Sequence, residues 1–455
     1  MNFIVAILVV VAVGYLIVKK YYAQGVLLLG GAALLLAAVI FNGTPILAKG
    51  GTGSLYLDVF AQLKANFIKT TGSLGIAIMI VSAFAKYMDH IGASKALVKV
   101  AIKPLQKLNS PYIVLALSYV VGQILNIFIP SASGLGVLLM VTVYPIVVSL
   151  GVSPLAATAV IGTSACLDLG PASGNAVLAS KTAGIDAALY FVDYQVPVAI
   201  VTVIVITAIH YFVNKSMDRK MDLAEKAKEE AEFEKEMNVE GKVPGLYALL
   251  PIIPLIIILV FSPLTGSKIR VDVVEAMFMS IALSMFIEGI RRKAFKSTLS
   301  ELKIVFTAMG SQFANVITLI VAGEFFALGL TKIGVISALI DSTKSAGLGP
   351  QPMILVMTAI IALSSILMGS GNAPFFAFAA LAPAVAASVD LNPIVMLMPM
   401  QLAAGIARSI SPITAVIVAV AGISGVSPFN VVKRTAAPMV GGLIAVLITN
   451  MILFG

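Results

Sequence analysis

The sequence predicts an all-α membrane protein that crosses the bilayer many times and is built from two inverted repeats. Of its 455 residues, 60% are hydrophobic and only 11% are charged, whereas soluble domains carry about 25% charged residues. Apolar stretches long enough to span a bilayer recur from one end of the chain to the other. Small polar residues interrupt these stretches at matching places in both halves, a pattern typical of transporters with discontinuous helices.

The first half, residues 1–213, is expected to form the first repeat. Its opening segment, Phe3–Val18, has no basic residue before it and two lysines after it, so we expect a retained transmembrane helix rather than a signal peptide. The later elements follow in order: spans at about Gly25–Phe41 and Gly75–Phe84 (the latter longer at its start), a re-entrant helical hairpin at 111–150, a broken helix at 155–179 and a span at Leu189–Val213.

The second half, residues 244–455, offers the same series after a charged segment. That segment, residues 214–243, holds seven Lys/Arg and nine Asp/Glu, which predicts a solvated helical linker on the cytoplasmic side. The elements expected beyond it are spans at Leu246–Phe261, Val273–Ile287 and Ile304–Leu328, a hairpin at 352–387, a broken helix at 393–420 and a last span at Thr435–Phe454.

The two halves align on their glycines and prolines. Pro145 matches Pro383, Pro171 matches Pro412, and the offset drifts only from 238 to 242 along six ordered matches. Each half then holds five spans and one hairpin, and the odd number of spans inverts the second repeat in the membrane. With both termini outside, 21 basic residues fall on the cytoplasmic side and eight outside, as the positive-inside rule requires.

Both hairpin tips consist of small polar residues without charge. A side chain in each tip can cap the helix that follows, either Ser131 or Ser133 in the first and either Ser370 or Asn372 in the second. Two helix N-termini then point into the membrane, and such termini favour anions. We therefore expect a buried anion site rather than two ordinary surface turns, formed by Ser131, Ser133, Gly134, Ser370, Gly371 and Asn372.

Two apolar helices break at their middle. A new half-helix is expected to start at Gly170-Pro171 in the first half and at Ser411-Pro412 in the second, where the serine is the cap and proline suits the first helical turn. Polar residues around the breaks are expected to reach the same cavity: Thr163, Ser164, Asp168, Ser173 and Asn175 in the first half, and Arg408, Ser409, Ser411 and Thr414 in the second.

Arg408 is the only basic residue inside an expected span. A guanidinium in a membrane is costly unless it is paired, so such residues are functional candidates, and guanidinium binds carboxylate in a bidentate way. We expect Arg408 to contact an anionic substrate; the alternative is a structural pair with Asp168 or Glu324. Three roles stay open for Asp168, namely carrying a coupling proton, ligating Na⁺, or neutralising Arg408 in the empty site. For Glu324 we expect a packing or ion-pair role.

Five long strings of the sequence carry a family resemblance: Tyr87–Ala93, Ser133–Met140, Gly369–Phe375, Arg408–Pro412 and Val426–Thr435. Through them the chain resembles the anaerobic C4-dicarboxylate carriers of the Dcu type C family over nearly its whole length. The resemblance implies transport of succinate, fumarate or malate, and a place in the ion transporter superfamily. Many members of that superfamily are dimers in which a transport domain moves against a scaffold domain like an elevator. Asp168 departs from the neutral residue that the resemblance implies at its position.

The sequence therefore predicts a secondary active transporter of C4-dicarboxylates in the bacterial inner (cytoplasmic) membrane. It is expected to be a homodimer with both termini periplasmic, and Na⁺ or H⁺ is the expected coupling ion. A carrier of another carboxylate, such as an amino acid or a peptide-like acid, is an alternative because Asp168 suits a substrate amine. An anion channel is a further alternative.

Several other classes are excluded or disfavoured by composition. The single cysteine, Cys166, excludes an internal disulfide and an all-cysteine metal site. His90 and His210 lie far apart, so we expect no metal beyond Na⁺ and no cofactor. Without a histidine cluster or a Gly-x-Ser-x-Gly elbow, an enzyme is not expected. The excess of basic residues lies beside the spans and is not the pattern of a nucleic-acid-binding protein.

Overall fold

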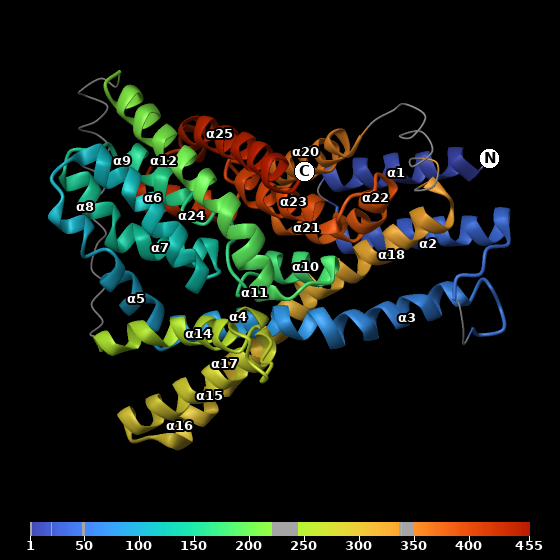
Figure 1. Cartoon of the computed structure of the whole chain (residues 1–455), viewed down its shortest axis with the longest axis horizontal. Coiled ribbons are helices and arrows are strands. Elements are labelled where there is room, and N and C mark those ends of the chain that lie inside the picture. Colours follow the sequence, from blue (N-terminus) through green and yellow to red (C-terminus); the bar gives the residue numbers. More distant parts are fainter. Residues whose placement is uncertain (1, 20, 48–50, 221–243, 336–337, 339–348) are drawn as a thin grey trace.

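The structure, a computed structural model, describes residues 2–19, 21–47, 51–220, 244–335, 338 and 349–455, and the regular secondary structure in these ranges is helical. No strand occurs within these ranges (Figure 1). Seven helices there are long and apolar enough to cross a membrane, or eight if the bent pair Ile76–His90 and Ala93–Lys107 counts as one span. The prediction of an all-helical polytopic membrane protein is therefore confirmed.

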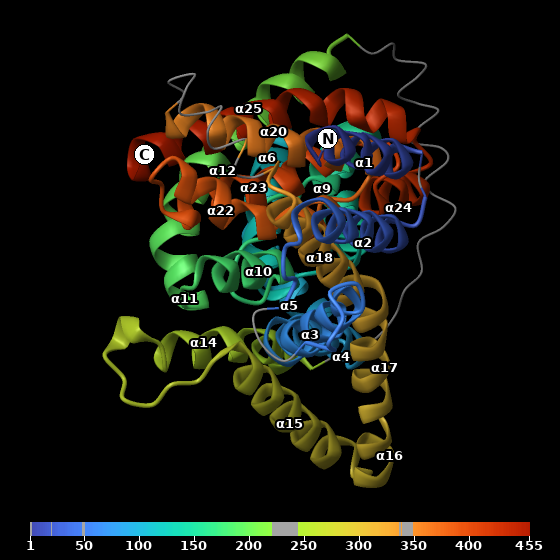
Figure 2. The same ribbon diagram turned by 90° about the vertical axis from the view of Figure 1, so that its right-hand side faces the viewer.

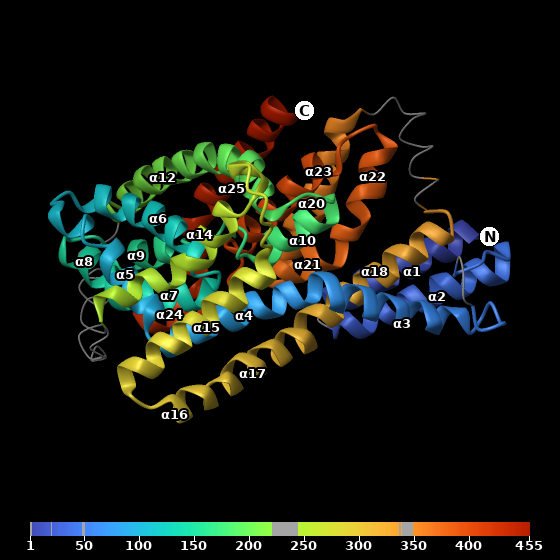
Figure 3. The same cartoon turned by 60° about the horizontal axis from the view of Figure 1, so that its bottom comes forward.

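The first half forms a series of helices with two π-helical joints. The joint Thr71–Gly75 connects α3 to α4 without ending the helix (Figure 3). The joint Tyr190–Gln195 connects α11 to α12 in the same way. The helices are α1 (Asn2–Val18), α2 (Ala23–Asn42), α3 (Asp58–Thr70), α4 (Ile76–His90), α5 (Ala93–Ala101), α6 (Pro111–Phe128), α7 (Ala132–Thr142), α8 (Tyr144–Ser149), α9 (Pro154–Gly162), α10 (Gly174–Ala183), α11 (Ala187–Leu189) and α12 (Val196–Asp218).

The second half is also a series of helices. A 3₁₀ segment, Gly245–Ile252, precedes α14, and a third π-helical joint, Phe313–Ile317, connects α17 to α18. The helices are α14 (Ile253–Val260), α15 (Val273–Arg292), α16 (Phe295–Ser300), α17 (Leu302–Gln312), α18 (Thr318–Lys332), α20 (Pro350–Met368), α21 (Asn372–Phe378), α22 (Ala382–Ser388), α23 (Pro393–Arg408), α24 (Ala415–Ser424) and α25 (Pro428–Phe454).

The helices pack in two groups, each drawing on both halves of the chain. The frame group contains α1–α5 and α14–α18, in which α2 packs against α18 and α4 against α15 and α17. The hairpin group contains α6–α12 and α20–α25, in which α12 packs against α25, α7 against α24, and α10 against α23. The hairpin group lies to one side of α4, α14 and α15, and α16 joins α15 to α17 far from α25 (Figures 1 and 2).

A buried ion pair changes the expected boundary of the linker. Helix α12 continues to Asp218, five residues beyond the expected end of its span, and Asp218 pairs with Arg434 (Oδ1 to Nη1, 2.6 Å). Arg434 immediately precedes the last span as expected from the sequence, Thr435–Phe454, yet it lies inside α25 and is only 1% exposed. Ser153 Oγ (2.7 Å) and Tyr112 Oη (3.0 Å) also donate to the Asp218 carboxylate. This cluster joins α6, α9, α12 and α25. Residues 221–243 of the expected linker lie outside the described residues.

The broken helices form the centre of the hairpin group. Every residue of α9 and nearly every residue of α23 is buried, so neither helix is amphipathic and both are surrounded by protein. The breaks at their ends are therefore surrounded mainly by protein, although Ile413 of the second break is 44% exposed. Such an environment is required for backbone groups that lack intrahelical partners at membrane depth.

Candidate functional site

A serine caps the second helix of each hairpin. Ser131 is the N-cap of α7, and its Oγ accepts a hydrogen bond from Gly134 N (3.2 Å). Ser370 Oγ accepts from Ala373 N (3.3 Å) in the first turn of α21. In the first tip the cap is therefore Ser131 and not Ser133. In the second tip the side chain that accepts from the helix is that of Ser370 and not that of Asn372. This leaves the side chains of Ser133 and Asn372 available to line a cavity.

The half-helices begin later than the prolines predict. Helix α10 starts at Gly174 with Ser173 as N-cap, and α24 starts at Ala415 with Thr414 as N-cap. The expectation that Ser411-Pro412 starts a half-helix is wrong. The backbone N–H of Ser411 bonds to Arg408 O (3.0 Å), so this segment is still in a tight turn, and Thr414 Oγ1 donates to the same carbonyl (2.5 Å).

Arg408 and Asp168 form an ion pair between the two breaks. Arg408 Nη2 donates to Asp168 Oδ1 (3.0 Å) and to the Ala165 carbonyl (2.8 Å), and Nη1 donates to Asn372 Oδ1 (3.4 Å). Both charged side chains are buried. Of the two carboxylates considered for Arg408, Asp168 is the partner. Glu324 instead accepts a hydrogen bond from Thr70 Oγ1 (2.6 Å).

Two asparagines complete a polar ring around this pair. Asn175 Nδ2 donates to Asp168 Oδ2 (2.9 Å) and to Asn372 Oδ1 (3.1 Å). Asp168 has a φ of +47°, a left-handed conformation that aspartate adopts more readily than most residues. The ring of Asp168, Arg408, Asn372 and Asn175 thus joins the first break, α23, the second hairpin tip and α10.

Three buried glutamines support the first break. Gln123 Nε2 donates to Thr163 O (3.0 Å), Gln401 Nε2 donates to Leu167 O (3.1 Å), and Gln195 Oε1 accepts from Gly170 N (3.1 Å). Gln195 Nε2 also donates to Gln401 Oε1 (2.7 Å). The sequence analysis did not single out these residues. A signal was present, because each is a glutamine inside an apolar stretch, where it needs polar partners.

The ring faces a cavity of about 1100 Å³ between the two groups. The frame group contributes residues of α4, α16 and α17 to its wall, including Lys86, Thr307 and Ser311. The hairpin group contributes the tip of the first hairpin, the first break and the ring. Eight of the predicted site residues line this cavity: Ser131, Ser133, Gly134, Asp168, Ser173, Asn175, Asn372 and Arg408.

The other predicted site residues lie behind the cavity wall. Most of their contacts are local: Ser164 Oγ donates to Val160 O (3.1 Å), Ser409 Oγ donates to Gly405 O (3.0 Å), and Ser370 and Thr414 make the bonds given above. Thr163 Oγ1 instead reaches another helix and lies 3.0 Å from His210 Nε2 of α12. A methyl group at Gly371 would collide with the Ala404 carbonyl, so glycine lets the tip approach α23. These residues shape the site rather than line the cavity.

The ring retains unused hydrogen-bonding capacity. Arg408 Nε and Asn175 Oδ1 are buried and have no hydrogen-bond partner among the described residues. Leaving a buried polar atom unpaired costs about 1–3 kcal/mol. Buried polar atoms without partners next to a cavity indicate a place for a polar ligand, and the guanidinium selects one with a negative charge.

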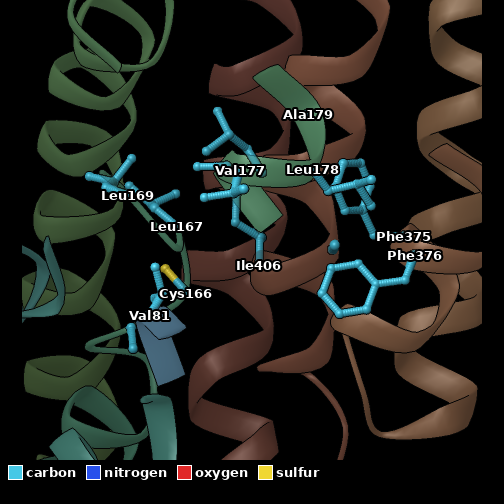
Figure 4. Close-up of a cluster of buried hydrophobic side chains, with 14 of the residues drawn as sticks. Val81, Cys166, Leu167, Leu169, Val177, Leu178, Ala179, Phe375, Phe376 and Ile406 are labelled. Atoms are coloured by element: carbon cyan, nitrogen blue, oxygen red, sulfur yellow. The ribbon is translucent and has the colours of Figure 1, made fainter. Parts of the chain in front are cut away.

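Apolar side chains surround the elements that carry the polar ring. Figure 4 shows Cys166, Leu167 and Leu169 of the first break opposite Ile406 of α23, with Phe375 and Phe376 of α21 on the far side. All of these residues are buried. The apolar surroundings lower the local dielectric response, which strengthens the attraction between Arg408 and any anion that reaches it.

Comparisons with known proteins agree with these observations. A family model described as the C4-dicarboxylate anaerobic carrier, DcuC, matches residues 1–455. The probable anaerobic C4-dicarboxylate transporter DcuC of Vibrio cholerae serotype O1 is 38% identical over 403 residues, which is 88% of this chain and 86% of that protein. The anaerobic C4-dicarboxylate transporter DcuC of Escherichia coli strain K12 is 34% identical over 403 residues, 89% of this chain and 86% of that protein.

A solved structure shares the fold. The YdaH transporter of Alcanivorax borkumensis matches with a TM-score of 0.56 and 14% sequence identity, over 91% of this chain and 95% of that chain.

The fold and the polar site define a multi-pass membrane transporter. The chain belongs to the DcuC family of anaerobic C4-dicarboxylate carriers. It is therefore a transporter and not an enzyme, and its bacterial relatives imply the cytoplasmic membrane.

Proposed function

We propose that this chain carries C4-dicarboxylates such as succinate, fumarate and malate by alternating access, as an exchanger or a cation-coupled carrier. The observation that carries the proposal is the position of Arg408. Its guanidinium lies at a cavity of about 1100 Å³ and keeps a buried Nε without a partner among the described residues. That atom and the neighbouring Nη offer a fork that matches one carboxylate of a dianion.

The second carboxylate of the substrate is proposed to bind at the first hairpin tip. The N-terminus of α7, a helix of 11 residues, carries the Ser131 cap, and Ser133 and Gly134 also line the cavity. Unpaired N–H groups at a helix N-terminus attract anions. A dianion held between Arg408 and this terminus would be recognised at both of its ends.

Asp168 is proposed to couple substrate binding to a cation. It pairs with Arg408 at 3.0 Å, so a carboxylate that binds the guanidinium must displace it. The freed carboxylate then needs a proton or Na⁺, because an unpaired charge in a buried place is costly.

The two groups of helices are proposed to be the scaffold and transport domains of two inverted repeats, 1–213 and 244–455, joined by the linker 214–243. Packing supports this reading, since α7 lies on α24 and α10 on α23, each hairpin-group element meeting one from the other half. The hairpin group would move against the frame group like an elevator. Both termini are proposed to be periplasmic, and a homodimer is proposed on the family resemblance.

The direct test is counterflow of labelled succinate in liposomes that contain the purified protein. We expect Arg408→Ala to lower the transport rate at least about 100-fold, because it removes a charge-assisted bidentate contact, and Arg408→Lys to restore little of it. Arg270→Ala, at an exposed arginine, serves as the matched control and should transport normally. Unchanged counterflow in Arg408→Ala would refute the role of this residue.

Two further experiments distinguish the possible substrates and the possible coupling ions. Competition by a panel of C4-dicarboxylates, amino acids and peptide-like acids identifies the substrate class, and only dicarboxylates should compete. Imposed Na⁺ and pH gradients identify the coupling ion. Ion currents without saturable exchange would indicate an anion channel and would contradict the proposal.

A further inference from the structure

The segment after α4 turns away from the direction of the spans. Residues 93–107, made of α5 and the 3₁₀ turn Leu105–Lys107, are bent by 77° from α4. The bend lies at Gly92, whose φ of +77° glycine adopts without strain. Hydrogen bonds from Ile102 N to Val98 O (3.1 Å) and from Leu105 N to Ile102 O (3.0 Å) keep the segment helical to its end. Helix α4 continues α3 through the π-helical joint Thr71–Gly75. Taking this continuous helix as the span, a segment bent by 77° from it runs close to the membrane plane.

One face of the segment is packed inside the protein. Leu97, Val98, Ile102 and Leu105 are buried, and α5 packs against the 3₁₀ segment Gly245–Ile252 of the frame group and against α6 and α7 of the first hairpin. The segment therefore touches both groups of helices.

The other face carries a row of exposed lysines. Lys99, Lys103 and Lys107 recur every fourth residue and are exposed, and no ion pair within the described part of the chain involves them. Two apolar side chains are exposed beside them, Val100 at 44% and Leu108 at 38%. Exposed apolar residues next to lysines, on a helix along the membrane plane, are typical of interfacial helices that bind acidic lipid.

We propose that Lys99, Lys103 and Lys107 bind the phosphate groups of anionic phospholipids. Lysine attracts phosphate as a compact charge, and basic segments beside spans gather such lipids. The acidic stretch within residues 221–243 of the same chain is a competing partner, but it would leave Val100 and Leu108 in water, whereas lipid covers them. Because the segment touches both groups, a lipid bound here adjoins the seam between them.

The experiment measures the thermal unfolding midpoint of the purified full chain in neutral detergent with added phosphatidylglycerol or phosphatidylcholine. Native mass spectrometry counts the retained lipid. We expect phosphatidylglycerol, but not phosphatidylcholine, to raise the midpoint. The triple variant Lys99→Gln, Lys103→Gln, Lys107→Gln should lose most of that rise and bind phosphatidylglycerol at least about tenfold more weakly, because lysines near an anionic surface contribute additively.

Matched variants keep the result interpretable. Lys64→Gln, Lys268→Gln, Arg270→Gln removes three exposed charges elsewhere and should behave like the unaltered protein. The Lys→Arg triple should retain the rise, since charge is what binds, and the single Lys103→Gln should give an intermediate loss. The proposal fails if the Gln triple keeps the full rise, or if phosphatidylcholine acts equally well. It also fails if the Gln triple, in the absence of added lipid, lowers the midpoint by as much as it does with phosphatidylglycerol, because the lysines then serve a partner within the chain.

Discussion

The two broken helices occupy corresponding places in the two halves, yet they are built differently. Helix α9 has 9 residues before the first break, whereas α23 has 16 before the second. The first break is the longer, running over residues 163–173, and the second covers residues 409–414. Asp168 and Gly170 in the first break have positive φ, while the second has no such residue.

The backbone groups of the two breaks also differ in their hydrogen-bond partners. In the first, glutamines of other helices and Arg408 pair with the carbonyls, as described above. In the second, the backbone N–H groups of Ser409, Ile410 and Ser411 bond to the carbonyls three residues before them, as several N–H groups of the first break also do. Thr435 Oγ1 of α25 donates to Ser409 O (2.7 Å), so the second break also receives a bond from another helix, but fewer such bonds than the first. Arg408 is the last residue of its helix, where the helix dipole favours a cation.

This difference shows that helix breaks at corresponding places in the two halves do not produce similar sites. The second break supplies a positive charge fixed on a helix end. The first supplies a negative charge on a loop that is held in place by side chains from elsewhere. A loop of this kind can adjust when a ligand takes one of its partners, so the first break is the expected place for coupling.

The largest expected effect comes from separating the pair that joins the breaks. Asp168→Ala leaves Arg408 with no carboxylate and should lower the free energy of unfolding by about 3–5 kcal/mol, as breaking a buried ion pair does. Adding Arg408→Met should recover a good part of the loss, which chemical unfolding in detergent would measure. If the single and double variants lose the same amount, the pair does not couple the two breaks.

The second-largest effect is expected when the first break loses a hydrogen bond from another helix. Gln401→Leu removes the donor to Leu167 O and the acceptor of Tyr190 Oη and Gln195 Nε2, so we expect a loss of about 2–3 kcal/mol. Gln62→Leu on α3, whose bond to Asn66 is only partly buried, is the control. A loss below about 1 kcal/mol would show that the first break depends on other helices as little as the second does.

The close approach of the first break to α23 can be tested with one methyl group. A Cβ at Gly405 would overlap the Cys166 carbonyl oxygen, so Gly405→Ala should cost about 1–3 kcal/mol. Gly422 in α24 has open space around it, so Gly422→Ala should be neutral or slightly stabilising. Equal melting temperatures for the two variants would contradict the packing described here.

The smallest effect is expected in the second break. Thr414→Val keeps the side-chain shape and removes the donor to Arg408 O, which should cost about 1 kcal/mol. Transport should persist, because neighbouring turns still hold the segment. A loss as large as that of Gln401→Leu would remove the contrast between the two breaks.

The sequence by itself determined the class of the molecule and the position of its breaks. Hydropathy identifies membrane helices because lipid admits few charges, and breaks are visible because small polar residues cannot continue an apolar run. Arg408 and Asp168 could be selected for the same reason, as charges where charge is costly. Arg434 was missed because it lies next to Lys433 at the start of a helix, where it looks like part of a basic loop.

Only the tertiary structure decided which of these residues meet. Asp168 and Glu324 were equal candidates for Arg408 in sequence, and the packing of the first break against α23 made the choice. Pairing across 240 residues leaves no local trace. The glutamines that hold the break and the true starts of α10 and α24 were likewise settled by neighbours. A backbone group in a break takes its partner from whichever helix lies beside it, and helix packing alone determines that neighbour.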